Sequence, residues 1–317
     1  MAKTRRERGE ELSAADLQRL QEAVGRSDVD LTRSVHGPGS VTWRVNREVA
    51  LLAGGGCALM LQVAHPLVAA GVARYSNFKQ DPLQRLYRTL DLVLTITFCD
   101  AVQAIHAVRE IERRHARVHG TLSEGIGPFP RGTVYDANDP ELLLWVHATL
   151  VDTGLRAYEM FIETLSDEDR ATYYEESKIT GRLFGIPETL LPPTWSKFEK
   201  YMRTMTQGNQ LAVSPAAQDI AASILQPAAP FGLRDLLPPL NLLTLGLLPP
   251  ELRELYGYTW SGTCETLMRA EVTATRLLIP WLPGAVRFFP HARRAASSEG
   301  LRRPAGVGEL RSEGVRA

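Results

Sequence analysis

Residues 81–120 read DPLQRLYRTLDLVLTITFCDAVQAIHAVREIERRHARVHG, and this stretch decides the fold class. Asp81 followed by Pro82 is typical of a helix start, apolar side chains then recur at helical spacing, and Gly120 is a typical helix stop. Only the β-branched run at 93–97, VLTIT, also suits a strand. Because the periodicity continues so far, we expect a helical segment with a bend inside it.

The same helix signals recur along the rest of the chain. Ser13 and Ser166 stand where side-chain caps of helices are expected, and the Asp139–Pro140 pair repeats the start seen at residue 81. Few segments alternate with the period of a β-strand, and no internal repeat is visible. These patterns predict an all-α protein.

Composition changes only at the two ends of the chain. The first residues are charged, and the last 25 are basic, rich in small residues and nearly free of large apolar side chains. We therefore expect a flexible N-terminus at 1–14, a single large helical domain at 15–292 and a disordered basic tail at 293–317. The tail could contact phosphate groups, although a solubilising end is the simpler interpretation.

One segment is long and apolar enough to be taken for a membrane span. Residues 49–73, VALLAGGGCALMLQVAHPLVAAGVA, contain no Asp, Glu, Lys or Arg. The consecutive glycines 54–56, Gln62, His65 and Pro66 argue against a single spanning helix. We expect two helices buried in protein that meet at Pro66, with the glycines allowing close packing against a neighbour.

The totals of charged residues and cysteines restrict the function classes. Lys plus Arg and Asp plus Glu each number 36, so the net charge is zero and nothing points to nucleic acid or an anionic membrane as an obligatory partner. Three cysteines without metal-ligand spacing suit a reducing compartment, and the charged N-terminus lacks the apolar core of a signal peptide. The expected location is the cytoplasm, with no membrane required.

Four of the seven histidines are candidate ligands. If the helix continues to Gly120, His115 and His119 share one of its faces and could hold a metal, although a solvated face beside arginines is the alternative. His147, in ELLLWVHATLV, and His65, before Pro66, lie in apolar surroundings that predict burial. A buried imidazole is commonly a hydrogen-bonded core residue, and in an all-α chain it can also be a haem ligand.

Arg85, Arg88 and Thr89 in RLYRT are three and four residues apart, so they can crowd one side of a helix. Turned inward, they could bind cofactor propionates or a distal oxygen species. The alternative is an ordinary ladder of surface ion pairs. The motifs HExxH, GxSxG, GxxxxGK and CxxC, which carry other catalytic chemistry, are not in the sequence.

Several blocks of sequence, taken in order, resemble the DUF2236 family, which is the MpaB-type and rubber-oxygenase (latex clearing protein) catalytic domain. They are 41–89, which ends in RLYRT, then HARVHG at 115–120, YDANDPELLLWVHATLVDT at 135–153 and AYEMFIETLSDEDRATYYEE at 157–176. The resemblance runs from about residue 37 to 290. It implies an all-α fold that binds b-type haem and uses dioxygen to cleave carbon–carbon double bonds in isoprenoid chains.

The resemblance also implies roles for particular residues. Rubber-cleaving members carry an Arg-x-x-Lys-Thr segment on the distal side of the haem, and Arg85, Arg88 and Thr89 match it with arginine in place of lysine. Arginine stays protonated and does not ligate iron, so any role of that lysine is altered here. For the proximal histidine that binds the iron, ungapped spacing leads to His119, whereas the family pattern H-x-x-V-x-G leads to His115, which we prefer.

His147 and His65 are the remaining candidates for contact with the cofactor, as a second ligand or as pocket wall. The expected function is a haem b-dependent oxygenase that acts with dioxygen on an apolar, unsaturated small molecule. The alternatives are a non-catalytic haem carrier or sensor, closed on its distal side by His147 or His65, and a metal-free helical interaction protein.

Overall fold

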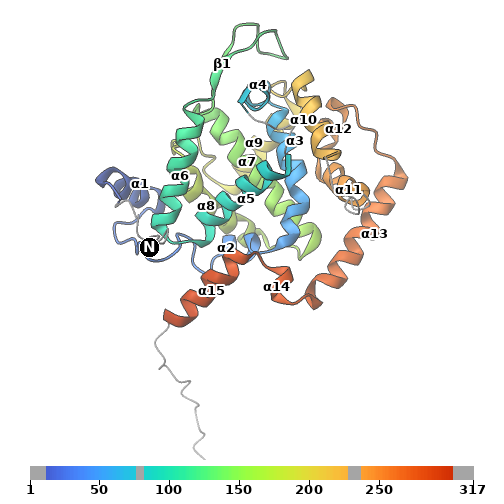
Figure 1. Cartoon of the computed structure of the whole chain (residues 1–317). Helices are drawn as coiled ribbons and strands as arrows, with labels where there is room; N and C mark the ends of the chain where they lie inside the picture. The colour runs from blue at the N-terminus through green and yellow to red at the C-terminus, as the bar shows by residue number, and fades with distance from the viewer. Residues whose placement is uncertain (1–11, 76–81, 228–236, 303–317) are drawn as a thin grey trace, which may run out of the picture.

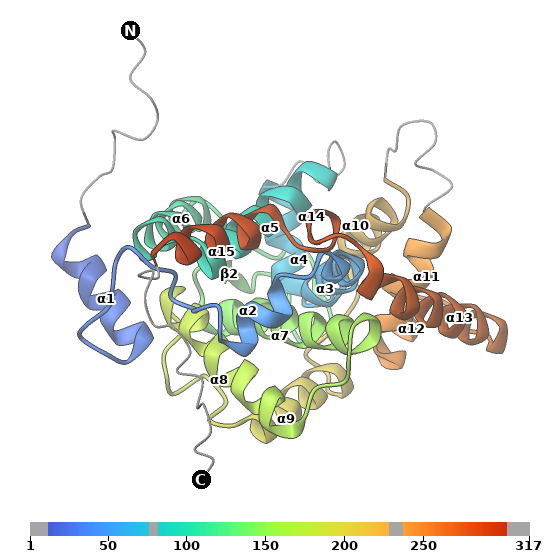
Figure 2. The same ribbon diagram turned by 90° about the horizontal axis from the view of Figure 1, so that it is seen from below.

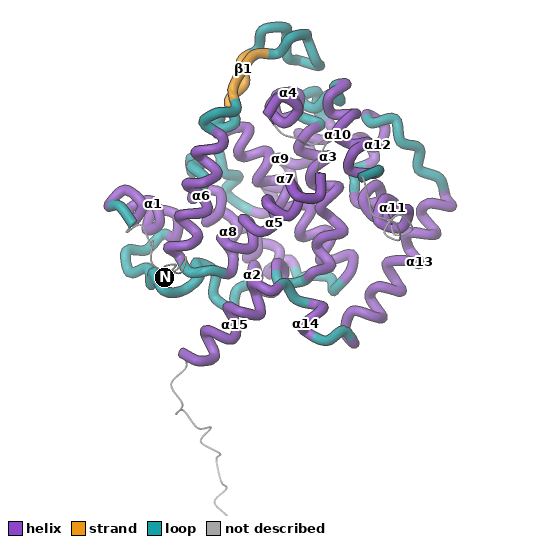
Figure 3. The backbone as a smooth tube through the Cα atoms, viewed as in Figure 1, coloured by secondary structure: helices purple, strands orange, loops and turns teal. Residues whose placement is uncertain are grey.

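The computed structural model describes residues 12–75, 82–227 and 237–302, and it confirms the all-α class (Figures 1 and 3). Besides the helices, the described residues form one antiparallel sheet of two short strands, which projects above the helices in Figure 3. The elements are α1 (Ala14–Val24), α2 (Val41–Asn46), η2 (Val49–Gly54, a 3-10 helix), α3 (Gly55–Val63), α4 (Pro66–Tyr75), α5 (Pro82–Phe98), α6 (Ala101–His115), β1 (His119–Thr121), β2 (Val134–Asp136), α7 (Pro140–Phe161), α8 (Asp167–Leu183), α9 (Trp195–Gln207), α10 (Pro215–Leu225), α11 (Leu237–Leu247), α12 (Pro250–Leu255), α13 (Gly262–Leu278), η4 (Ile279–Trp281, a 3-10 helix), α14 (Gly284–Arg287) and α15 (Pro290–Arg302).

The stretch at 81–120 is helical with the expected interruption, but it ends earlier than predicted. The break between α5 and α6 lies at Cys99 and Asp100, and the Asp100 side chain accepts a hydrogen bond from the backbone N–H of Gln103 at 2.8 Å. The β-branched run at 93–97 is helical. Asp81, the expected cap of α5, lies outside the described residues. Helix α6 ends at His115 rather than near Gly120, which separates two of the candidate ligands.

Three further helix starts were predicted correctly. The side chains of Ser13, Asp139 and Ser166 accept hydrogen bonds from backbone N–H groups in the first turns of α1, α7 and α8. Pro140 is the first residue of α7, where its missing N–H costs nothing. These short local signals therefore set where α1, α7 and α8 begin.

Helix α7 runs through the middle of the molecule, and most of the core is built on it (Figure 2). It contacts η2, α2, α3, α8, α9, α11 and α13. Large side chains along it, among them Trp145, Tyr158 and Phe161, are fully buried. Burial of this apolar surface is the main stabilising term of the fold.

The apolar segment 49–73 forms η2, α3 and α4, and Pro66 begins α4 as expected. The close packing expected of the glycines is confirmed at Gly54 and Gly56. A Cβ on Gly54 would lie 2.9 Å from Cγ2 of Thr153 in α7, and one on Gly56 would lie 2.8 Å from Thr244 in α11. Within the described residues no single helix is both long and apolar enough to cross a membrane. The pair Val49–Val63 and Pro66–Tyr75, bent by 107°, passes that test of length and composition.

The C-terminal part of the chain packs back onto an early part. Phe289 and Ala292 are buried against Trp43 of α2 and Phe98 of α5. Helix α15 continues to Arg302, so the first ten residues of the segment expected to be disordered, 293–302, are helical. Residues 1–11 of the expected flexible N-terminus and 303–317 of the expected tail lie outside the described residues.

A buried ion pair stabilises this junction between the C-terminal part of the chain and the segment around α2. The carboxylate of Glu48, which is 1% exposed, accepts two hydrogen bonds from Arg287, at 2.8 Å from Nε and 2.9 Å from Nη2. The backbone N–H of Phe289 donates to the carbonyl oxygen of Arg47 at 2.9 Å. Arg47 also lies near, with its Nε 3.7 Å from Oε1 of Glu48. Residues almost at opposite ends of the chain are thus held together.

Candidate functional site

The stretch HARVHG at 115–120 lies against α4. A Cβ on Gly71 of α4 would be 3.1 Å from Cγ1 of Val118, so the two segments are in close contact. The hydroxyl of Tyr75, at the end of α4, donates to the carbonyl oxygen of His119 at 2.8 Å. The ring of Tyr135, in β2, packs against Gly120 and also lies close to Gly71 of α4. These contacts hold the end of α6 beside the helix that begins just after His65.

His115 and His119 do not share a helical face, so the expected pairing of these two side chains is wrong. The backbone N–H of Val118 bonds to the carbonyl oxygen of His115 at 2.7 Å, which closes a turn at the end of α6. His119 then begins β1, where it pairs with Asp136, and its side chain is exposed. His115 is half-buried. The described residues contain no group of three or more His, Cys, Asp or Glu side chains placed to bind a metal ion.

A surface hollow of about 520 Å³ opens at the end of α6, and Ala116, the residue after His115, is part of its lining. Its volume falls within the range of about 300–1,000 Å³ found for small-molecule sites, but it is open to solvent. The ends of α6 and α8 and the start of α7 enclose it. The lining residues are Glu112, Arg113, Ala116, Asn138, Leu143, Phe184 and Gly185.

His65 is buried between α3 and α4, as its sequence context predicts. Its ring lies 5.2 Å from the ring of Phe129, centroid to centroid, and its Nδ1 has no hydrogen-bond partner. Burial lowers the pKa of His65 to about 4, against an opposing effect of Asp139. The imidazole is therefore neutral at pH 7, which is the form that ligates metals.

His147 is also buried and neutral, but α8 covers it. Burial lowers its pKa to about 4, and its Nε2 has no hydrogen-bond partner. A Cβ on Gly181 of α8 would lie 3.3 Å from that nitrogen, so the backbone of α8 packs directly against the ring. A group bound to Nε2 would require α7 and α8 to separate.

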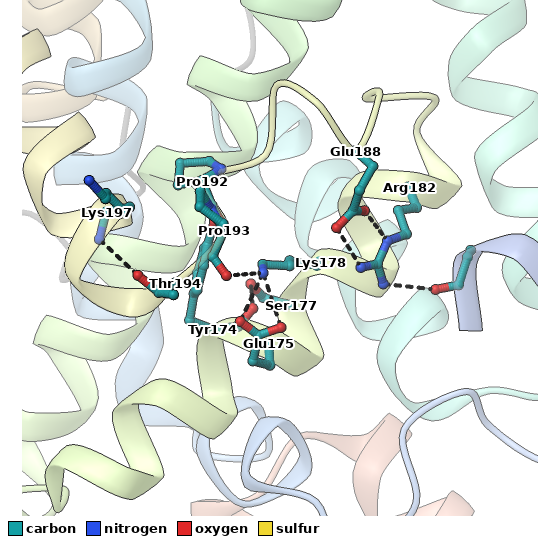
Figure 4. Close-up of polar contacts among 11 residues, drawn as sticks. Tyr174, Glu175, Ser177, Lys178, Arg182, Glu188, Pro192, Pro193, Thr194 and Lys197 are labelled. Atoms are coloured by element: carbon teal, nitrogen blue, oxygen red, sulfur yellow. Dashed lines mark hydrogen bonds and ion pairs between the residues drawn. The ribbon is translucent and has the colours of Figure 1, made fainter. Parts of the chain in front are cut away.

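A polar network secures the face of α8 and the loop that follows it (Figure 4). The buried ammonium of Lys178 donates to Glu175 at 2.8 Å and to the carbonyl oxygen of Pro193 at 2.9 Å. Arg182 binds Glu188 with two hydrogen bonds, of 2.6 and 3.1 Å. Burial of Lys178 was not predictable from the sequence, because ESK between helical residues is typical of a solvated face.

Arg88 and Thr89 lie in α5, at the start of the part whose side chains the structure describes. Arg88 is exposed and Thr89 is half-buried, whereas the side chain of Arg85 lies outside the described part of the structure. Among the described side chains of α5, which begin at Arg88, the first buried one is that of Leu94. Arg88 is exposed, so the structure does not show the inward orientation considered for it, and the surface alternative describes it.

His36 is a third buried imidazole, which the sequence analysis did not single out. It is 2% exposed, its Nε2 has no hydrogen-bond partner, and burial lowers its pKa to about 4. Its surroundings in the sequence, SVHGP, are those of a loop and carry no apolar pattern that would have predicted burial.

We expect the protein without cofactor to lose stability as the pH falls from about 6.5 to 4. The histidine pKa is about 6.5 in the unfolded chain and about 4 in the folded protein at His36, His65 and His147, so over this range the unfolded chain binds more protons. Each of these three histidines should lower the free energy of unfolding by about 1–2 kcal/mol between pH 7 and pH 5. Urea unfolding at the two pH values measures the loss.

Replacing His36 with glutamine should make that loss smaller, because one buried titrating group is gone. His119→Gln is the matched control, since the side chain of His119 is exposed. Equal pH dependence in the wild-type protein and in His36→Gln would contradict the prediction.

The chain is similar to a family of known proteins over most of its length. The family described as "ER-bound oxygenase mpaB/B'/Rubber oxygenase, catalytic domain" matches residues 43–277. Two relatives, uncharacterized protein Mb2261 of Mycobacterium bovis and uncharacterized protein Rv2237 of Mycobacterium tuberculosis, are each 26% identical over 239 residues, which cover 74% of this chain and 88% of theirs. No solved structure matches the chain. The matched region runs from α2 to α13 and includes the candidate histidines, so the chain belongs to the mpaB and rubber-oxygenase catalytic-domain family.

Proposed function

We propose that this protein is a haem b-dependent oxygenase that uses dioxygen to oxidise an apolar, unsaturated small molecule by cleaving a carbon–carbon double bond. The observation that carries the proposal is membership of an oxygenase catalytic-domain family over residues 43–277. The donor chemistry of the chain agrees with it, because His65 and His147 are neutral imidazoles with a free ring nitrogen.

His115 is the residue that we propose to hold the haem iron. It is half-buried at the end of α6, one residue before Ala116, which lines the open hollow. His119, in contrast, is exposed on the sheet, and α8 covers the free nitrogen of His147. The contacts of Val118 and Tyr75 with their neighbours fix the backbone on which His115 stands. When bound, haem would supply the iron that binds and activates dioxygen.

Arg88 and Thr89 are proposed to act from α5. The guanidinium of Arg88 is exposed and permanently charged, so it can donate hydrogen bonds to a carboxylate such as a haem propionate. Thr89 is half-buried one residue later and can donate a hydroxyl hydrogen bond on the protein side of Arg88. Arg85 precedes Arg88 by one helical turn and is proposed to share its role. His65 would form part of the pocket wall.

Absorption spectroscopy of the purified protein, produced in cells supplied with haem, tests the proposal. We expect a Soret band, a pyridine haemochromogen of the b type and a ratio near one haem per chain. Reduced protein should then consume oxygen in the presence of an unsaturated isoprenoid and release carbonyl products. A colourless protein without iron would refute the proposal. A six-coordinate low-spin ferrous form that ignores oxygen would instead support a non-catalytic haem carrier.

A further inference from the structure

Residues 277–286, LLIPWLPGAV, form an exposed apolar corner where α13 ends and the chain turns through η4 into α14. Figure 1 shows this corner at the lower edge of the molecule. The run contains no charged residue, and within it only Ile279 is buried. Trp281 is 86% exposed, Leu277 67% and Leu278 64%. Monomeric proteins rarely expose contiguous apolar surface without a partner for it.

The corner is firmly attached to the body of the protein at both ends. Arg276, the residue before it, donates hydrogen bonds to the carbonyl oxygens of Glu159 and Met160 at the end of α7. Arg287, the residue after it, forms the bidentate pair with buried Glu48. The exposure of Trp281 therefore belongs to a held conformation and does not come from a loose end of the chain.

We propose that this apolar corner docks the protein on an anionic lipid surface, with Trp281 and its leucine neighbours inserted among the headgroups. Tryptophan and leucine on a short turn suit the boundary between headgroups and acyl chains, where the indole ring keeps a polar edge in water. The inserted groups form a small patch, which suits reversible association rather than a spanning segment.

Charge complementarity favours an anionic lipid surface. Residues 276–317 contain eight arginines, three glutamates and no lysine or aspartate, a net charge of +5 in a chain whose total is zero. Because Arg287 is neutralised by its partner Glu48, a net charge of +4 is left to attract an anionic surface. Arg293 and Arg294, at the start of α15 just after the corner, are exposed. Basic residues beside an inserted apolar group strengthen binding to anionic headgroups.

The same charges disfavour a second copy of the chain as the partner. A two-fold symmetric contact through the corner would bring two equivalent basic segments close together, and like charges that face each other oppose association. The proposal does not depend on haem or on oxygenase activity.

Sedimentation of the full-length protein with phospholipid vesicles tests this inference. We expect binding to vesicles that contain phosphatidylglycerol, weaker binding to pure phosphatidylcholine, and a decrease when the salt concentration rises. Trp281→Glu should weaken binding by at least about tenfold, because it replaces the inserted ring with a charge. Brominated lipids should quench tryptophan fluorescence in the wild-type protein and much less in the variant.

Val134→Glu is the matched control. Val134 is 70% exposed on β2. The substitution therefore replaces an exposed apolar side chain with an acidic one, as Trp281→Glu does, but outside the corner. It should bind vesicles as the wild-type protein does, and both variants should keep the wild-type circular dichroism and melting temperature. Failure to bind phosphatidylglycerol vesicles at low salt, or equal binding by Trp281→Glu and wild type, would overturn the proposal. So would a wild-type dimer that Trp281→Glu converts to monomer.

Discussion

Replacing His115 with alanine is expected to leave the purified protein with at least about tenfold less haem than the wild-type protein. The expectation follows from the proposed function. Loss of a residue that only orients a metal ligand typically lowers metal affinity by about 10–100-fold, and loss of the iron ligand itself should lower haem affinity by at least as much. The measurement is the pyridine haemochromogen content per chain. Added imidazole should restore part of the iron coordination in a His115→Gly variant.

His119→Ala is the control for this experiment. It removes an imidazole from the same short stretch, but one that is exposed on β1. It should keep the wild-type haem content, and circular dichroism should show that both variants are folded. Haem loss in His119→Ala together with retention in His115→Ala would show that the two assignments must be exchanged. Haem loss only in His65→Ala would move the ligand to the turn between α3 and α4.

Replacing Arg287 with methionine is expected to lower the free energy of unfolding by about 3–5 kcal/mol. The variant keeps an unbranched apolar side chain but leaves the carboxylate of Glu48, 1% exposed, without its bidentate partner. An uncompensated buried charge accounts for a cost of this size. Arg47, 3.7 Å from Glu48, is the neighbour that would limit the loss. Urea unfolding monitored by circular dichroism gives the measurement.

Arg269→Met provides a control in which an exposed ion pair with one hydrogen bond of the same length is lost. Arg269 and Glu265 also approach to 2.8 Å, but both side chains are exposed, at 78% and 43%. Exposed pairs four residues apart in a helix contribute about 0.3–0.5 kcal/mol, so this variant should be nearly as stable as the wild-type protein. Equal effects in the two variants would show that burial of Glu48 is not what makes its ion pair important. A Glu48→Leu, Arg287→Met double variant should recover part of the lost stability.

Helix starts were predictable because their signals are local. Ser13, Asp139 and Ser166 satisfy backbone N–H groups within three residues, and the sequence shows that spacing directly. The apolar setting of His147 likewise predicted its burial. The end of α6 was not predictable, because the pairing of His119 with Asp136 joins residues on either side of a long loop. The helical periodicity of the sequence continues beyond His115, so the predicted helix was too long.

The orientation of Arg88 was missed for a related reason. Which side of a helix faces protein depends on its neighbours in the folded chain, and the spacing of Arg88 and Thr89 within the helix does not identify that side. The buried state of Lys178 depends on Pro193, which comes back to α8 after an intervening loop. Contacts of this kind follow from the packing of the whole chain, and short sequence motifs do not report them.

The link between Glu48 and Arg287 spans 239 residues, and this has a consequence for how the protein is made. During synthesis the N-terminal half of the chain emerges first, with Glu48 in place but its counterion not yet translated. Closing so long a loop is slow, because chain entropy must be lost before the contact forms. The nascent chain therefore cannot form this junction before α14 emerges, and a polypeptide truncated just before Gly284 should depend on chaperones for solubility.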